Sequence, residues 1–303
     1  MVSNILLGII LAAGAATGVA LTAALGSTSF KKEQSSGPAS ATFLGLAIGS
    51  LVAFLVATLT GQISALSRVD LPIVGIFALV GLLQNAVARR LWFVAVKNIG
   101  ANQSNTLAAT EGLYSMVLAV LFLGESVSLI LALGAALILF AIFLTEASSS
   151  ASLRAGSARL GYLTALLAAV CYGVRQVLVS YGLSIFPFFL FSLLIAYTTG
   201  LLFHVIIERP GRVVSQLRGT PRATFTAFTV MGVLTILTQM MSFSSLELAP
   251  VVFFAPLFSC YPIFTVLLTR IRASGYEVFG RRTFLSVSMV VVGAVLVSVA
   301  SIL

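Results

Sequence analysis

Long apolar stretches dominate this sequence, and they constrain its fold more than any other feature. A helix needs about 20 consecutive apolar residues to cross the roughly 30 Å hydrocarbon core of a bilayer. Ten stretches of the 303-residue chain meet this requirement. They are residues 4–26, 41–60, 71–96, 101–123, 126–145, 159–183, 185–207, 223–243, 248–269 and 283–303. Because backbone polar groups in lipid must pair within their own segment, the pattern predicts an all-α membrane protein with ten transmembrane helices.

The composition supports a membrane protein and excludes several other classes. Only 8% of the residues are charged, against about 25% in a soluble domain. No soluble region is long enough to hold a catalytic or nucleic-acid-binding domain. We therefore expect a multi-pass protein of the cell (inner) membrane, with the lipid bilayer as a partner and no nucleic acid. The first stretch is expected to be a retained helix and not a secretory signal, because Lys31 and Lys32 follow it.

The chain divides into two similar halves around a serine-rich connector. The segment 95–112 of the first half aligns with 245–262 of the second. We assign residues 1–146 to the first repeat, 147–158 to the connector and 159–303 to the second repeat. Because each repeat holds five stretches, an odd number, the two repeats cross the membrane in opposite directions. Inverted five-helix repeats are typical of secondary transporters, with the substrate site near the midplane, although a simple structural duplication is the alternative.

Both halves carry motifs of a known family. These are Arg89-Arg90-Leu91-Trp92-Phe93-Val94-Ala95, Ile99-Gly100-Ala101, Leu123-Gly124-Glu125 and Gly134, then Leu248-Ala249-Pro250, Pro262, Glu277 and Gly293. On these residues almost the whole chain resembles the EamA-type branch of the drug/metabolite transporter superfamily. The resemblance implies a ten-helix carrier that moves small metabolites or drugs without ATP. Gly112 stands where the family commonly has a proline, so the resemblance does not imply a proline kink in the fourth helix, whereas Pro262 holds the equivalent place in the ninth.

The basic residues of the connectors predict an orientation. Connectors after odd-numbered stretches hold thirteen of them, and connectors after even-numbered stretches hold only Arg68. The thirteen are Lys31, Lys32, Lys97, Arg154, Arg159, Arg209, Arg212, Arg218, Arg222, Arg270, Arg272, Arg281 and Arg282. Because basic loops stay in the cytoplasm, this distribution places both termini outside. The family resemblance implies both termini in the cytoplasm, and we follow the charges.

Two arginines of the third stretch lie inside the apolar region, where an unpaired charge is costly. Arg89 and Glu111 lie at about the same depth on either side of the turn near Gly100. We expect them to form an ion pair that joins two helices, and the alternative is that the substrate competes for one partner. Arg90 lies about 100° further round the helix, so we expect it to extend toward the interface as a structural residue.

Arg175 is the third arginine within an apolar stretch, and no acid lies in the same stretch to pair with it. We expect Arg175 and the adjacent Gln176 to contact the substrate. Pairing of Arg175 with Glu111 across a cavity is the alternative.

Gln239 and Tyr261 complete the predicted pocket, because the alignment of the halves places them opposite Arg89 and Glu111. Tyr114 is a further candidate, with ordinary helix packing as the equal alternative. Such a pocket carries net positive charge, which favours an anionic or carboxylate-bearing substrate because an unpaired buried cation is costly.

The other reactive side chains are interpreted as structural. We place His204, the only histidine, at a membrane interface near a helix end. Glu125 and Glu277 lie at helix starts, where a carboxylate accepts amide N–H groups. Cys171 and Cys260 form no metal motif, so we expect no metal and no cofactor.

Together these features predict a secondary transporter that moves a small-molecule substrate, such as an amino acid or an organic acid, by alternating access. The alternatives are an exporter of neutral or cationic drugs or metabolites, a non-transporting membrane scaffold, and an intramembrane enzyme. We expect no enzyme, because one histidine and no paired acids leave no catalytic constellation. A phosphate-binding Gly-x-x-x-x-Gly-Lys-Ser/Thr loop for ATP-driven pumping is also missing. The sequence leaves a homodimer open.

Overall fold

The computed structural model describes residues 2–32, 38–99, 101–146, 155–208, 211, 215, 220–272 and 281–301, and within them all secondary structure is helical. The first half contains α1 (Val2–Lys32), α2 (Pro38–Leu59), the 3₁₀ helix η1 (Gln62–Arg68), α3 (Leu71–Gly81), the π-helical η2 (Leu82–Ala88), α4 (Arg89–Ile99), α5 (Ala101–Ala108), α6 (Glu111–Leu118), the π-helical η3 (Ala119–Leu123) and α7 (Leu129–Glu146). The second half contains α8 (Ala155–Ile185), α9 (Phe189–Glu208), α11 (Arg222–Leu248), α12 (Val251–Phe258), α13 (Tyr261–Arg272) and α14 (Arg281–Ala300).

Seven of these helical segments are long and apolar enough to cross a membrane. They are Ser3–Ala23, Thr42–Leu59, Leu71–Val96, Ser104–Leu123, Arg159–Ile185, Phe189–Glu208 and Arg222–Leu248. Shorter apolar helices cover Leu129–Leu144, Val251–Thr265 and Ser288–Ala300. Large apolar side chains cover the outside of the bundle, among them Leu129 at 76% and Phe122 at 74% exposed, as lipid-facing residues should be. The chain is therefore a multi-pass helical membrane protein, and the count of ten crossings stays a prediction.

Prolines and glycines at the connections fix where several helices begin and end. A proline in the first turn begins α3, and Pro221 and Pro250 directly precede α11 and α12, because proline lacks the N–H that the first turn leaves unpaired. Gly61 and Gly124 adopt left-handed conformations, with φ of 74° and 67°, and turn the chain after α2 and η3. Residues 147–154 of the predicted connector lie outside the described residues, and its residues 155–158 belong to α8.

Two of the predicted helices are interrupted at equivalent places. The segment 101–123 breaks at Ala109 and Thr110, and the segment 248–269 breaks at Ser259 and Cys260. Thr110 and Ser259 share the same backbone angles, φ −65° and ψ −7°. The first break forms although residue 112 is a glycine and not a proline. A side chain at Gly112 would overlap Ser259 and lie 2.9 Å from the carbonyl oxygen of Ala255, so glycine there allows α6 to cross closely over α12.

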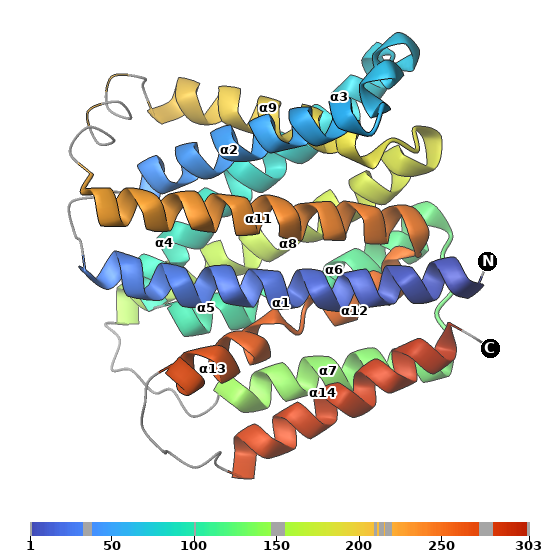
Figure 1. Ribbon diagram of the computed structural model, residues 1–303. Helices are drawn as coiled ribbons and strands as arrows, with labels where there is room; N and C mark the ends of the chain where they lie inside the picture. The colour runs from blue at the N-terminus through green and yellow to red at the C-terminus, as the bar shows by residue number, and fades with distance from the viewer. Residues whose placement is uncertain are drawn as a thin grey trace.

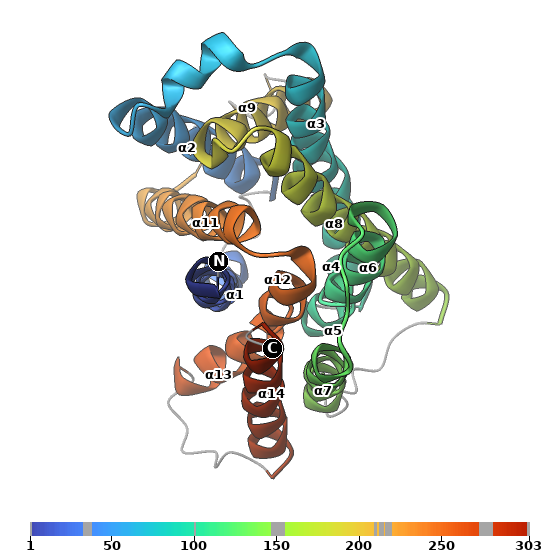
Figure 2. The same ribbon diagram turned by 90° about the vertical axis from the view of Figure 1, so that its right-hand side faces the viewer.

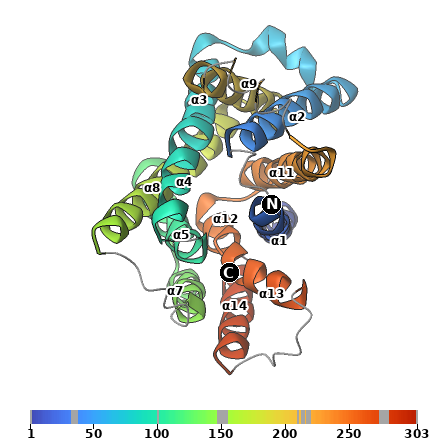
Figure 3. The same cartoon turned by 90° about the vertical axis from the view of Figure 1, so that its left-hand side faces the viewer.

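The halves pack against each other helix by helix. Figures 2 and 3 show α1 beside α11, α7 beside α14 and α2 beside α9, and these pairs are in contact. A close approach joins α7 and α14, where a Cβ on Gly134 would lie 2.9 Å from the carbonyl oxygen of Gly293. Small residues let helices approach closely in lipid, where packing replaces the hydrophobic effect. The two glycines singled out in the sequence therefore face each other across the junction of the halves.

The bundle has two distinct ends. Figure 1 shows the start of α1 and the end of α14 at one end. At the other end α1 and α9 finish and α2 and α11 begin, and we call this the basic end. Basic residues of the described helices occur there, including Lys31 and Lys32 at the end of α1 and Arg222 at the start of α11. The helix directions therefore gather these basic residues at one end, as the connector charges predict.

Candidate functional site

Polar side chains are buried in the middle of the bundle where α6, α8 and α11 meet. They are Glu111, Arg175, Gln176, Gln239 and Ser242, and we call them the central cluster. None is more than 7% exposed. Arg175 is one of the largest fully buried side chains among the described residues. Since ionisable groups inside a membrane bundle are costly and mark ligand pathways more often than packing, the central cluster is the first candidate site.

Arg175 is held only by neutral groups. Its Nη2 donates hydrogen bonds to Oε1 of Gln239 at 3.1 Å and to Oγ of Ser242 at 3.4 Å. The guanidinium also lies over the ring of Phe243, with Cζ 5.6 Å from the ring centroid. Its Nε has no partner among the described residues. A buried cation in this state has lost its hydration without gaining a carboxylate at hydrogen-bond distance.

Glu111 begins α6 directly after the break and faces α8. Its Oε2 accepts a hydrogen bond from Nε2 of Gln176 at 3.2 Å, and Oε1 of Gln176 has no partner among the described residues. Glu111 lies close enough to Arg175 to interact electrostatically, but these two described side chains form no ion pair. The expected ion pair between Glu111 and Arg89 is wrong, because these two described residues form no such contact. Glu111 faces Gln176, whereas Arg89 lines a cavity beside α9.

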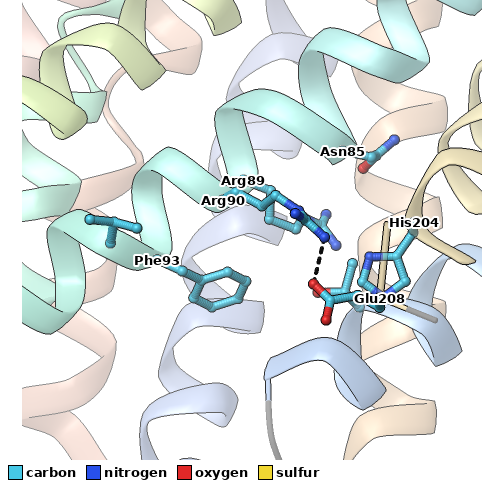
Figure 4. A pocket seen from close by; sticks show the side chains of 8 residues that line it. Asn85, Arg89, Arg90, Phe93, His204 and Glu208 are labelled. Carbon is cyan, nitrogen blue, oxygen red and sulfur yellow. Dashed lines mark hydrogen bonds and ion pairs between the residues drawn. The ribbon is translucent and has the colours of Figure 1, made fainter. Parts of the chain in front are cut away.

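Arg89 and Arg90 turn instead toward α9. They line a cavity of about 390 Å³ together with residues of α2, η2, α4 and α9, and we call it the α4–α9 cavity. Its lining residues are Thr42, Asn85, Arg89, Arg90, Phe93, Val94, His204 and Glu208. Figure 4 shows the ion pair in which Nη2 of Arg90 donates to Oε1 of Glu208 at 2.5 Å. Arg90 thus binds a carboxylate on α9, and its extension toward the interface stays a prediction.

The predicted tyrosines have different surroundings. Tyr261 begins α13 after the second break, and its hydroxyl donates to the backbone oxygen of Asn105 at 3.4 Å. It is 6% exposed and close enough to Glu111 to interact electrostatically. Tyr114 lies where α6 packs on α8, since a Cβ on Gly173 would come within 2.9 Å of the Tyr114 Cβ. Gly173 therefore provides the room that lets α8 approach α6.

The sequence reasoning did not select three residues that the structure places at these sites. Ser242 is a direct partner of Arg175. Tyr197 of α9 is 2% exposed and lies close enough to both Arg89 and Arg175 to interact electrostatically with each. Asn85 lies in η2 and is also 2% exposed. Of the three, Asn85 had the clearest signal in the sequence, because it is a polar amide within a mostly apolar stretch.

Glu125 is a helix cap, as expected, but it caps a helix of the other half. Its Oε1 and Oε2 accept hydrogen bonds from the backbone N–H groups of Val251 at 2.9 Å and Val252 at 2.8 Å, at the start of α12. Burial raises the pKa of the Glu125 carboxyl, and the two backbone hydrogen bonds oppose this shift. Glu125 therefore ties the first half to the second. Glu277, its counterpart in the sequence, lies outside the described residues.

The fold and the buried polar centre together define a multi-pass membrane protein with a polar interior. The EamA-like transporter family matches residues 6–146 and again 159–299. The chain therefore belongs to the EamA-like transporter family, whose members are membrane transporters of the drug/metabolite transporter superfamily. No curated protein matches it. A solved structure titled "Crystal structure of protein" is similar over 99% of this chain and 97% of its own, with a TM-score of 0.75 and 17% sequence identity, and this likeness concerns the fold alone.

Proposed function

We propose that this protein is an ATP-independent secondary transporter that carries a small carboxylate-bearing metabolite through the central cluster. The observation that carries this proposal is Arg175, a fully buried guanidinium whose Nη2 binds only neutral partners and whose Nε is free of a described partner. The carboxylate of a substrate would supply the anionic acceptor that the buried guanidinium of Arg175 lacks.

The central cluster favours a zwitterion over a dianion. Arg89 lies in the α4–α9 cavity, so the cluster holds one guanidinium and one carboxylate, instead of the net positive charge expected from the sequence. Each of the two charges is hydrogen-bonded to a neutral amide, Arg175 to Gln239 and Glu111 to Gln176. An α-amino acid would place its carboxylate on Arg175 and its ammonium group on Glu111. We therefore propose an amino acid ahead of an organic acid.

The transport cycle proposed here is alternating access by two inverted five-helix halves. Ten crossings follow if the shorter apolar helices Leu129–Leu144, Val251–Thr265 and Ser288–Ala300 also span the bilayer. The equivalent breaks at Thr110 and Ser259 support a related architecture in the two halves, because both share one backbone geometry. Discontinuous helices at a midplane site are typical of such carriers. The halves would rock about contacts such as Gly134 against Gly293.

The test is exchange transport by the full chain in proteoliposomes loaded with unlabelled probe. Labelled L-alanine, lactate, succinate and choline are offered in turn to the wild type, to Arg175→Gln and to Arg159→Gln. Arg159 is the matched control, because it lies on the same helix but is exposed. We expect uptake of alanine, and of lactate to a smaller extent, in the wild type and in Arg159→Gln and its loss in Arg175→Gln. Uptake of choline alone, unchanged in Arg175→Gln, would instead favour an exporter of cations.

A further inference from the structure

The α4–α9 cavity contains a polar side chain that nothing in the described protein satisfies. Asn85 is 2% exposed, and neither its Nδ2 nor its Oδ1 has a hydrogen-bond partner among the described residues. A buried amide in this state costs about 1–3 kcal/mol. The side chain packs against Gly200 of α9, where a Cβ would lie 2.7 Å from Nδ2. Glycine at this position thus leaves the room that the Asn85 amide occupies.

Asn85 belongs to the π-helical η2, which leads directly into α4. The backbone N–H of Arg89 donates to the carbonyl oxygen of Gln84, the longer reach of a π-helix. Single-turn π-helical segments occur often at functional sites. This segment places Asn85 and Arg89 among the residues that line one cavity.

The charges of the lining favour an anion. Arg90 is neutralised by Glu208, whereas Arg89 has no ion pair with any described acid. The net formal charge of Arg89, Arg90 and Glu208 together is therefore positive. The volume of about 390 Å³ lies within the range of 300–1,000 Å³ for small-molecule sites. Phe93 and Val94 supply apolar wall beside the polar groups, as ligand pockets commonly have.

We propose that the α4–α9 cavity is a second binding site, which takes a small carboxylate carrying a hydrogen-bond donor next to its anionic group, such as a 2-hydroxy or 2-amino carboxylate. The carboxylate binds Arg89 and accepts from Nδ2 of Asn85, and the neighbouring hydroxyl or ammonium donates to Oδ1 of Asn85. Both unpaired atoms of the amide are then satisfied by one ligand. Figure 4 shows the side chains of Arg89 and Arg90 directed toward Glu208 and His204, with Asn85 apart from them.

The position of this site gives it a place before the central cluster. Thr42 lies near the start of α2 and Glu208 ends α9, so the cavity lies toward the basic end of the bundle. Tyr197 is close enough to Arg89 of the cavity and to Arg175 of the central cluster to interact electrostatically with both. A substrate that enters from the basic end meets Arg89 first and Arg175 second. This last role rests on the proposed function, whereas binding in the cavity does not.

The test uses a thiol placed in the cavity without altering the proposed ligands. Cys171 and Cys260 are the free cysteines of the described residues, and both are replaced by alanine. Thr42→Cys then introduces a cavity thiol at a residue that is 5% exposed. Its rates of modification by an anionic sulfonatoethyl and a cationic trimethylammonioethyl methanethiosulfonate are each divided by the rate with free 2-mercaptoethanol. We expect the normalised rate to be about tenfold higher for the anionic reagent, and the preference to vanish in Arg89→Gln.

Protection from modification tests the ligand class. Lactate and propionate have the same charge and nearly the same size, but only lactate carries the hydroxyl. We expect lactate to protect the thiol at about tenfold lower concentration than propionate or inorganic phosphate, and this difference to disappear in Asn85→Leu. Equal protection by the three anions, or an equal or faster reaction of the cationic reagent in the unmodified cavity, would overturn the proposal.

Arg175→Gln separates this site from the proposed transport function. We expect the variant to lose alanine exchange while lactate still protects the cavity thiol. Loss of protection in Arg175→Gln would show that the cavity is not an independent site. Elution of each variant at the wild-type volume in size-exclusion chromatography confirms that the compared proteins are folded.

Discussion

The central cluster and the α4–α9 cavity hold the same type of cation in opposite surroundings. Arg175 is fully buried and is bonded to neutral side chains, while Arg90 is 38% exposed at the side chain and is bonded to a carboxylate. Arg89 lies half-buried beside that ion pair. The interior arginine therefore has the greater desolvation cost and the weaker protein partners. A ligand carboxylate has more to gain at Arg175 than at any other described arginine.

The two sites also differ in how their buried polar side chains lack hydrogen-bond partners. In the central cluster the unpaired atoms are Nε of Arg175 and Oε1 of Gln176, on side chains whose other atoms are bonded. In the cavity Asn85 has no partner for either atom. The central cluster is therefore a network that holds its own geometry, and the cavity amide depends on a ligand for all of its hydrogen bonds.

Arg175→Met has the largest expected effect and tests the first half of this comparison. Methionine fills an apolar space without charge, so the variant removes both the guanidinium and its desolvation cost. We expect alanine exchange to fall at least a hundredfold, because about 2–5 kcal/mol is lost when a buried charge pair with a ligand is removed. The melting temperature without ligand should stay near that of the wild type. A large drop in melting temperature, with exchange retained by the surviving folded protein, would make Arg175 a structural residue.

Glu111→Gln tests whether the central cluster recognises a zwitterionic substrate. The variant keeps the shape of the side chain and removes the charge that would face an ammonium group. We expect exchange of alanine to fall about tenfold or more, since a hydrogen bond to a charged group contributes about 1.5–3 kcal/mol, while lactate exchange changes little. The ratio of the two exchange rates is the measurement. A parallel loss for alanine and lactate would place Glu111 outside the recognition of the ammonium group.

Asn85→Leu tests the second half of the comparison with an effect of opposite sign. Leucine replaces an amide with two unpaired atoms by an apolar side chain of similar size. We expect the ligand-free protein to gain about 1–2 kcal/mol in stability, because the buried polar group no longer lacks partners. Thermal unfolding followed by the fluorescence of Trp92, the single tryptophan, measures this. Gln176→Leu is the contrasting variant, and it should destabilise the protein because it removes the hydrogen bond to Glu111.

Much of the fold could be predicted from the sequence, because apolar length and the repeat are read along the chain. Gly134 and Gly293 were singled out as motif residues, but their contact with each other was not predicted. The interruption at Thr110 was not predicted either, since no proline marks it and the close crossing that accompanies it involves Ser259 of the other half. Helix crossings depend on residues far apart in the sequence, which one sequence does not pair.

Four residues of the central cluster were among the predicted pocket residues, but their hydrogen-bond partners were not predicted. Arg175, Glu111, Gln176 and Gln239 do meet in the central cluster. Arg89 was matched to Glu111 because equal depth in the membrane can be counted along two helices. The direction in which each side chain points around its helix cannot be counted in this way, since it depends on helix breaks such as the one at Thr110. Glu208 is the residue that this reasoning could not connect to the third helix, because it lies at the end of α9, 118 residues from Arg90.

The Arg90–Glu208 ion pair should give the smallest effect and so sharpens the contrast with Arg175. The two side chains are 38% and 23% exposed, and exposed ion pairs contribute about 0–1 kcal/mol. We expect Arg90→Gln and Glu208→Gln each to lower the melting temperature slightly, and the double variant to be no worse than the more affected single one. High salt should reduce the difference between these variants and the wild type, because it screens a partly exposed pair. Since Glu208→Gln leaves Arg90 as a second unpaired cation, it should also raise the normalised preference of the Thr42→Cys thiol for the anionic reagent. An unchanged preference would mean that the ion pair lies outside the electrostatic field of the cavity.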